Sequence, residues 1–423
     1  MGAVQKVRGT RYRPASRGGG GLNVSPDTMS FLEMKSAPDP LWPRLTSLRL
    51  TVRIGWGVVR SALAFLSPSV TNLTLEPPRE SNVLLQPILS NIPDKCHRIQ
   101  GLRFDIAVGD SRSAHEVGRL ISAFRDTLQL LAIRSPLKAE YLPIIASLPQ
   151  LRRLQLDQAR FPGEIPSNSF PRLEEVHLQQ FRGGRLRQFF ECRREPGLKM
   201  VTVTSIQIID FDDLIAALSR SSTSLDHLLI SPVTNLDLSS TVISRLFTNL
   251  KYLYVGCPGN RSGECTFRPT DQAIANLGAA MPNLSDLTVG SHICVVLHTV
   301  TFKSLFSLST TCQKLKSLTI KVDLLGMVEI CLAGNESIET GTISGGGTKD
   351  NSCSLRKLAV GRSPFPDHPD SGLVVAVGLG KIFPSLSEIV PGGAVSGARW
   401  KEVERYIIMS RKALRAVQVV GQQ

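Results

Sequence analysis

The chain has 423 residues, of which 42% are hydrophobic, and this content is enough for a sizeable core. It carries 49 lysines and arginines against 35 aspartates and glutamates, a formal net charge of +14. No run of apolar residues reaches the length of about 18 that a membrane span needs, so we expect no membrane partner. The excess positive charge is spread along the chain rather than gathered in one patch, which disfavours nucleic acid as a partner.

Residues 1–30 are the first segment in chain order. They are rich in glycine, arginine and serine, and they contain few apolar side chains. Such a segment cannot bury enough apolar surface to offset the entropy of ordering its backbone. We therefore predict a disordered basic tail over residues 1–30, followed by one folded domain over residues 31–423.

A repeated pattern, L-x-x-[LVI]-x-[LVI], predicts the structure of the folded domain. Its copies lie on average roughly 28 residues apart, within the period of leucine-rich repeats. The fourth and sixth positions are two residues apart and so share one face of a strand, where stacked copies bury them in a continuous core. The fourteen copies begin at Leu45, Val70, Ile99, Leu128, Leu151, Leu173, Leu198, Leu225, Leu250, Leu284, Leu315, Leu355, Leu386 and Leu414.

The segments between the copies supply the return path. Several have the apolar spacing of helices, and in six copies a proline two residues before the first position stops the preceding helix. The sequence thus predicts an α/β leucine-rich-repeat solenoid (a horseshoe), with a parallel β-sheet on the concave face and helices and loops on the convex face. Later repeats hold insertion loops at 256–270, 334–353 and 361–370, and residues 414–419 are predicted to form the last strand.

Motifs of the common enzyme and cofactor classes are absent from the sequence. Gly346-Gly347-Thr348 is not the G-K-[ST] of a phosphate loop, and neither G-x-S-x-G nor H-E-x-x-H occurs. The eight cysteines include no C-x-x-C and no spacing typical of a metal site or of a disulfide framework. We therefore expect a non-enzymatic protein of the cytoplasm or nucleus, with reduced thiols, no cofactor and no metal.

Candidate partner-binding residues occupy positions three, five and seven of the repeats, which point away from the buried positions. Tyrosine and arginine are enriched at the energetic centres of interfaces, so Tyr252 and Tyr254 are predicted anchors beside an arginine-lined half that selects acidic or phosphorylated sequence. The alternative is that loops or the inserted segments cover this face. The candidates are Arg49, Arg103, Arg134, Arg153, His177, Met200, His227, Leu229, Tyr252 and Tyr254.

Two runs carry a resemblance to a known family. DPLWPRLTSLRL at residues 39–50 and FPRLEEV at residues 170–176 resemble the leucine-rich-repeat part of fungal F-box proteins, a likeness that covers roughly residues 31–423. The resemblance implies a receptor that binds protein substrates on its concave face for an SCF-type ubiquitin ligase, in which an F-box docks onto the adaptor of a cullin.

Residues 1–44 contain no F-box segment of the Leu-Pro-x-Glu-Ile-Leu kind. We therefore expect the cullin-ligase adaptor as a partner only if an F-box exists outside this chain. The alternative interpretation is a leucine-rich-repeat scaffold or GTPase regulator with no ubiquitin link.

Overall fold

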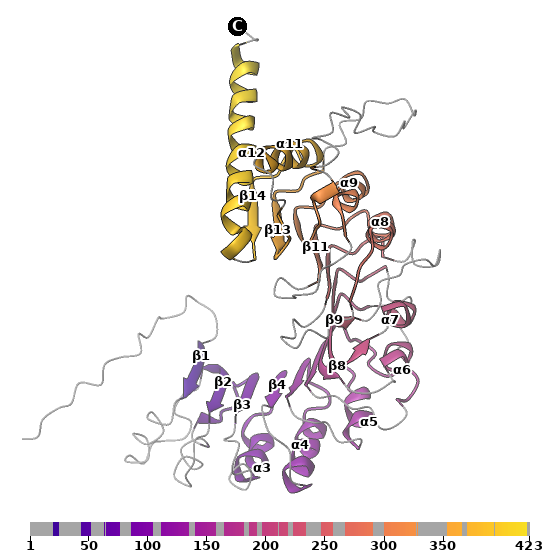
Figure 1. Ribbon diagram of the computed structural model, residues 1–423. Coiled ribbons are helices and arrows are strands. Elements are labelled where there is room, and N and C mark those ends of the chain that lie inside the picture. Colours follow the sequence, from indigo (N-terminus) through magenta and orange to yellow (C-terminus); the bar gives the residue numbers. More distant parts are fainter. Residues whose placement is uncertain are drawn as a thin grey trace, which may run out of the picture. The chain divides into compact units, whose positions relative to one another are not determined.

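The structure of the chain is a computed structural model. It describes residues 20–24, 44–51, 63, 65–76, 86–104, 111–134, 140–157, 165–181, 186–192, 197–209, 211–218, 223–233, 247–256, 267–290, 300–326, 328, 353–365, 370–392 and 394–420. The chain divides into two compact units, Met1–Leu173 and Glu174–Gln423. Each unit consists of parallel strands that follow one another in chain order, with helices between them (Figure 1).

Unit 1 contains six strands and three described helices. Its strands are β1 (Gly20–Val24), β2 (Leu45–Thr51), β3 (Asn72–Glu76), β4 (Gly101–Phe104), β5 (Leu130–Ile133) and β6 (Arg153–Asp157). Its helices are α3 (Gln86–Lys95), α4 (Ser111–Ala123) and α5 (Tyr141–Ala146). Each strand pairs in parallel with the next one along the chain, as the repeat pattern predicts.

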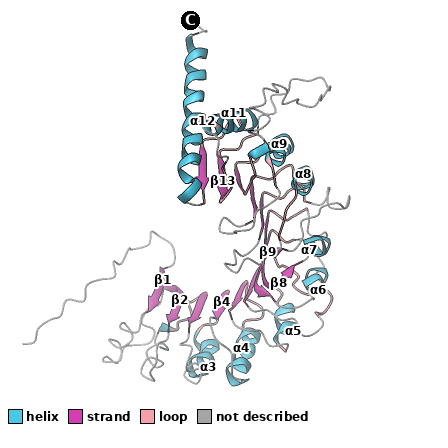
Figure 2. Cartoon of the chain, in the orientation of Figure 1, coloured by secondary structure: helices cyan, strands magenta, loops and turns pink. Residues whose placement is uncertain are grey.

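Unit 2 contains eight strands and six described helices, with the helices α6 to α9 lying along one side of the strands (Figure 2). Its strands are β7 (Glu175–Phe181), β8 (Met200–Ile209), β9 (His227–Val233), β10 (Tyr252–Val255), β11 (Asp286–Val289), β12 (Ser317–Ile320), β13 (Lys357–Gly361) and β14 (Glu388–Pro391). Its helices are α6 (Leu186–Glu191), α7 (Phe211–Leu218), α8 (Asp271–Ala280), α9 (Phe302–Thr311), α11 (Ser371–Ile382) and α12 (Ala394–Val420).

Alternation of burial along five strands confirms the predicted register. In β6, Leu154 and Leu156 are fully buried, whereas Arg153 is exposed and Gln155 is half-buried between the two leucines. The same alternation recurs in β3, β10, β11 and β12. Because side chains alternate between the two faces of a strand, positions four and six of each repeat build the core and the positions between them face outward.

Small polar residues immediately before the first position of a repeat join it to the preceding repeat. Thr127 Oγ1 donates to the Ile99 carbonyl over 2.7 Å, and Ser224 Oγ donates to the Leu198 carbonyl over 2.8 Å. Because a buried backbone carbonyl needs a hydrogen-bond donor, these side chains satisfy carbonyl groups that the hydrogen bonds between strands do not satisfy.

The prediction that residues 414–419 form the last strand is wrong, because these residues continue α12. The strand count nevertheless reaches fourteen, since β1 lies within the segment that was predicted to be a disordered tail. The rest of the predicted tail and most of the three predicted insertion loops lie outside the described residues. The boundary between a tail over residues 1–30 and a domain over residues 31–423 stays a prediction.

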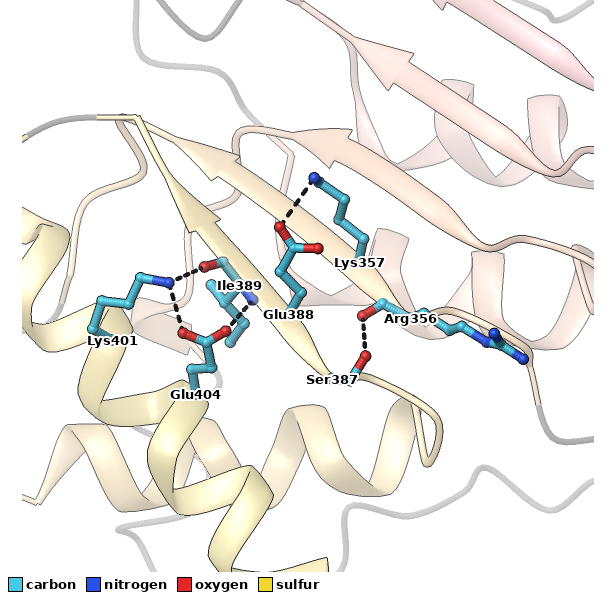
Figure 3. A network of polar contacts seen from close by, with 7 residues as sticks. All are labelled: Arg356, Lys357, Ser387, Glu388, Ile389, Lys401 and Glu404. Carbon is cyan, nitrogen blue, oxygen red and sulfur yellow. Dashed lines mark hydrogen bonds and ion pairs between the residues drawn. The ribbon is translucent and has the colours of Figure 1, made fainter.

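Helix α12 packs against the last strand, β14. Trp400, Val403 and Ile407 are buried at the spacing of one helix face. Ile389 of β14 donates its backbone N–H to Glu404 Oε1 over 3.2 Å, and its carbonyl accepts from Lys401 Nζ over 3.2 Å (Figure 3). Lys401 and Glu404 also pair with each other at 2.7 Å, so one turn of α12 satisfies both backbone groups of Ile389.

Candidate protein-binding face

The face of unit 2 that carries the outward-pointing residues of β7 to β14 is called the open face here. Two rows of side chains cross it, because the parallel pairing keeps the strands in register. Each row is named after the position that its residues occupy in their strands. The first row contains the first residue of each strand: Glu175, Met200, His227, Tyr252, Asp286, Ser317, Lys357 and Glu388. The third row contains the third residue of each strand: His177, Thr202, Leu229, Tyr254, Thr288, Thr319, Ala359 and Val390.

An aromatic pair lies in the first row. The rings of His227 and Tyr252 stack with their centroids 4.1 Å apart and their planes 10° from parallel. Tyr252 keeps 42% of its surface exposed, whereas His227 and its neighbour Met200 are half-buried. An exposed tyrosine that stacks on a second ring presents apolar surface and loses little side-chain conformational entropy on binding, which favours contact with a partner.

The third row has no charged residue from β8 to β14, and all seven of its side chains there are half-buried. Leu229 and Tyr254 lie side by side in this row on β9 and β10. This row therefore presents hydroxyl groups, methyl groups and one aromatic ring rather than ions. The candidates His177, Met200, His227, Leu229, Tyr252 and Tyr254 are thus brought together on four neighbouring strands of unit 2.

The four candidate arginines lie in unit 1. Arg49 on β2 forms an ion pair with Glu76 at 2.5 Å, and Arg134 after β5 pairs with Asp157 at 3.8 Å. Both carboxylates are less exposed than their arginines, with side-chain exposures of 19% and 16%. Arg103 on β4 and Arg153 on β6 are exposed. The predicted arginine-lined surface is therefore partly neutralised by carboxylates of neighbouring repeats.

Sequence reasoning overlooked the residue directly before each strand of unit 2. These residues form what we call the entry row, in which the backbone carbonyl of every member before Ser387 accepts from the next repeat. Its first four members alternate in sign and pair: Lys199 with Glu174 at 2.8 Å and Lys251 with Asp226 at 3.2 Å. The complete row is Glu174, Lys199, Asp226, Lys251, Ser285, Lys316, Arg356 and Ser387.

The buried thiols offer no reactive or metal-binding site. Burial raises the pKa of Cys96 and of Cys312 to about 11, and it also raises the pKa of Cys353. Such thiols stay protonated at neutral pH, and the thiolate is the reactive form. Within the described residues, no three His, Cys, Asp or Glu side chains gather as metal ligands, and no helix is long and apolar enough to span a membrane.

The fold defines the class of the protein, an α/β leucine-rich-repeat protein with a parallel sheet. Neither a family model nor a curated protein matches the chain. Among solved structures, a chain from the crystal structure of the Rad7 and Elc1 complex in yeast is similar to it, with a TM-score of 0.41 and 14% sequence identity. That similarity covers 88% of this chain and 85% of the other. The class assignment rests on the strand order and repeat spacing of this chain itself.

Proposed function

We propose that this protein is a non-enzymatic, protein-binding leucine-rich-repeat receptor that uses the open face of unit 2. The observation that supports the proposal most directly is the exposed His227–Tyr252 stack beside the uncharged third row. Large aromatic side chains are enriched at the energetic centre of protein interfaces, from which charged residues are depleted. A row of side chains spaced by about 4.8 Å per strand suits a polypeptide better than a small molecule.

The specific role that we propose is substrate recognition for an SCF-type ubiquitin ligase in the cytoplasm or nucleus. The support is the resemblance of residues 39–50 and 170–176 to the repeats of fungal F-box proteins. In this role the open face holds the substrate, and the adaptor of the cullin ligase joins only through an F-box outside this chain. A scaffold or GTPase regulator would use the same face without the ligase.

Affinity purification of the full chain, with partners identified by mass spectrometry, tests both levels of the proposal. Replacing Tyr252 and Tyr254 together by alanine should abolish recovery of the partners, because it removes the aromatic anchors without touching the buried positions four and six. Leu373→Ala is the matched control, since this exposed residue of α11 lies outside the rows of the open face. Circular dichroism melting should show that both variants remain folded.

The two levels fail differently. Recovery of the same partners at wild-type yield by the double variant would exclude the open face as the binding site. Specific partners without the ligase adaptor and cullin would favour the scaffold interpretation and leave the binding face intact. Co-purification of the adaptor with this chain alone would contradict the expectation that an F-box outside the chain is required.

A further inference from the structure

The entry row of unit 2 changes its character at β12 and β13. Up to β10, each basic residue of the row has a carboxylate on the preceding strand, in the Lys199–Glu174 and Lys251–Asp226 pairs. In the neighbouring first row the carboxylate lies on the following strand instead, since Lys357 of β13 pairs with Glu388 of β14 at 3.0 Å. Opposite charges on adjacent strands stabilise a sheet, so this arrangement needs no partner.

Lys316 and Arg356 break this rule. They stand next to each other in the row, because the backbone N–H of Arg356 donates to the Lys316 carbonyl over 2.9 Å. Both side chains are exposed, and neither makes an ion pair or a side-chain hydrogen bond with any residue in the described ranges. Figure 3 shows the guanidinium group of Arg356 extending away from the Lys357–Glu388 pair. Like charges on adjacent strands, about 4.8 Å apart, are destabilising.

The surroundings leave the two charges uncompensated. The row continues with Ser387 on one side, whose hydroxyl donates to the Arg356 carbonyl. On the other side is Ser285, whose Oγ lies 2.6 Å from Asp286 Oδ2 and 3.0 Å from the Lys251 carbonyl, so the nearest carboxylate is engaged by a serine. A third cationic side chain, that of Lys314, is also exposed, and its amine donates to the side-chain oxygen of Asn283 over 2.6 Å. The N-terminal ends of β12 and β13 therefore carry positive charge that the described residues of this unit do not neutralise.

We infer that Lys316 and Arg356 form a docking point for aspartate or glutamate side chains from an acidic segment of a partner protein. Elsewhere in these rows a carboxylate occupies the place beside each basic residue, so a carboxylate from the partner completes the same ladder. Arginine binds a carboxylate through two parallel hydrogen bonds, and lysine adds a point charge. The inference rests on the proposed protein-binding function, but it uses residues distinct from the tyrosines of the open face.

Charge complementarity favours an acidic peptide over a nucleic acid. Binding to nucleic acid draws on many phosphate contacts along a continuous basic surface. Here the basic pair is short, and carboxylates of Asp226, Asp286 and Glu388 lie in the same two rows. A polyanionic backbone that continued along the rows would meet these negative charges, whereas a peptide with a few acidic side chains would not.

Retention of the purified full chain on resin-bound peptide pools tests the inference. All pools have randomised flanks, and their two central residues are glutamate, serine or lysine; a further pool has a central phosphoserine, and a single-stranded oligonucleotide resin is run in parallel. We expect the glutamate pool to retain the chain at least roughly tenfold better than the serine pool, as one or two charge-assisted hydrogen bonds would give. The double variant Lys316→Gln with Arg356→Gln should fall to the level of the serine pool.

The control is Lys199→Gln, which removes a basic residue of the same row that already has a carboxylate partner, and its retention should equal that of the wild type. The inference is overturned if the double variant is retained as well as the wild type, or if the lysine pool performs as well as the glutamate pool. Retention confined to the phosphoserine pool or to the oligonucleotide would overturn the assignment to carboxylates. A second measurement is thermal melting: removing one of two adjacent like charges in the Lys316→Gln variant should not lower the melting temperature.

These outcomes are separate from those of the proposed function. The tyrosine double variant can lose its partners while the glutamate pool shows no preference, and in that case only the docking point fails. If both tests fail, neither the open face nor the docking point is the binding site.

Discussion

His227 and Tyr252 are register partners on β9 and β10, and their rings stack at a centroid distance of 4.1 Å. The pairing places one ring on each of two adjacent strands, so the backbone ladder fixes their separation. The stack therefore belongs to the folded sheet and is already formed before any partner binds. A rigid aromatic surface of this kind lowers the entropy that a partner must lose on binding.

A double-mutant cycle should detect this stack as a coupling between the two residues. We expect His227→Ala and Tyr252→Ala to be less than additive by about 0.5–1 kcal/mol, the usual contribution of an aromatic pair. Urea denaturation of the two single variants and the double variant measures the coupling free energy. Tyr252→Ala with Thr288→Ala is the matched control cycle, because Thr288 lies on the next strand in the other row. Full additivity for His227 and Tyr252 would show that the rings do not interact in solution.

Leu154 is expected to contribute strongly to stability, because its side chain is fully buried in β6. Leu154→Ala should cost about 2–5 kcal/mol through lost transfer free energy and the cavity left behind. The neighbouring Gln155→Ala should stay within roughly 0.5 kcal/mol, since Gln155 points to the other face. Chemical denaturation of the two variants compares them directly, and an equal effect of both would contradict the register.

The buried thiol of Cys312 should make stability depend on pH in alkaline solution. Its pKa is about 11 in the folded chain against an ordinary value of 9.0. The unfolded thiol therefore loses its proton first, so unfolding releases a proton between about pH 9 and pH 11 and stability falls as the pH rises through this window. Below pH 9 the contribution is fully present.

Urea denaturation of the wild type and of Cys312→Ala tests this prediction, at pH values from 8 to 11 spaced by about one pH unit. Comparing the two cancels the titration of tyrosines and lysines, and the variant should show the shallower fall. The native thiol should also react slowly with iodoacetamide at pH 8, because little thiolate is present. A variant with the same pH slope as the wild type would show that Cys312 titrates normally.

Trp400 anchors α12, and two substitutions at this position should separate the cost of losing the ring from the effect of losing its Nε1 donor. Its ring is fully buried and meets the Phe365 ring edge-on, with centroids 5.2 Å apart. Its Nε1 has no hydrogen-bond partner within the described part of the chain. Trp400→Ala should cost about 3–5 kcal/mol through the cavity. Trp400→Phe should cost clearly less, because it keeps a ring and removes an unsatisfied donor. Thermal denaturation of both variants tests the order, and an equal loss of stability in the two would contradict the packing of the ring.

The strands of the repeats could be predicted from the sequence because their buried positions are two residues apart, as in Leu154 and Leu156. In a parallel strand that lies between two others, side chains alternate between the two faces, so two leucines two residues apart indicate which face is buried. The same pattern misled at residues 414–419. True repeats such as that at Leu386 follow a helix that a proline ends, whereas no proline or glycine occurs from Ala398 to Val420, and the helix runs on.

The candidate face was predictable in part, because the outward positions follow from the same alternation. Tyr252 was singled out by its type and position, and the structure adds that His227 stacks on it. The ion pair between Arg49 and Glu76 was not predictable, since it joins different repeats and needs the register to be known. Lys316 and Arg356 were missed because only the strand residues were read. Aligning the residue before each strand would have shown the change from alternating to like charge.

Helix α12 has a consequence for how other polypeptides can approach this end of the sheet. The last strand of a parallel sheet normally offers free N–H and C=O groups to which a further strand can add, as in peptide augmentation or in aggregation. Here Glu404 and Lys401 occupy both backbone groups of Ile389 that would face such a strand. A visiting chain at β14 would have to displace these side chains before it could pair. Addition of a strand at Ile389 is thus opposed by two side chains of α12.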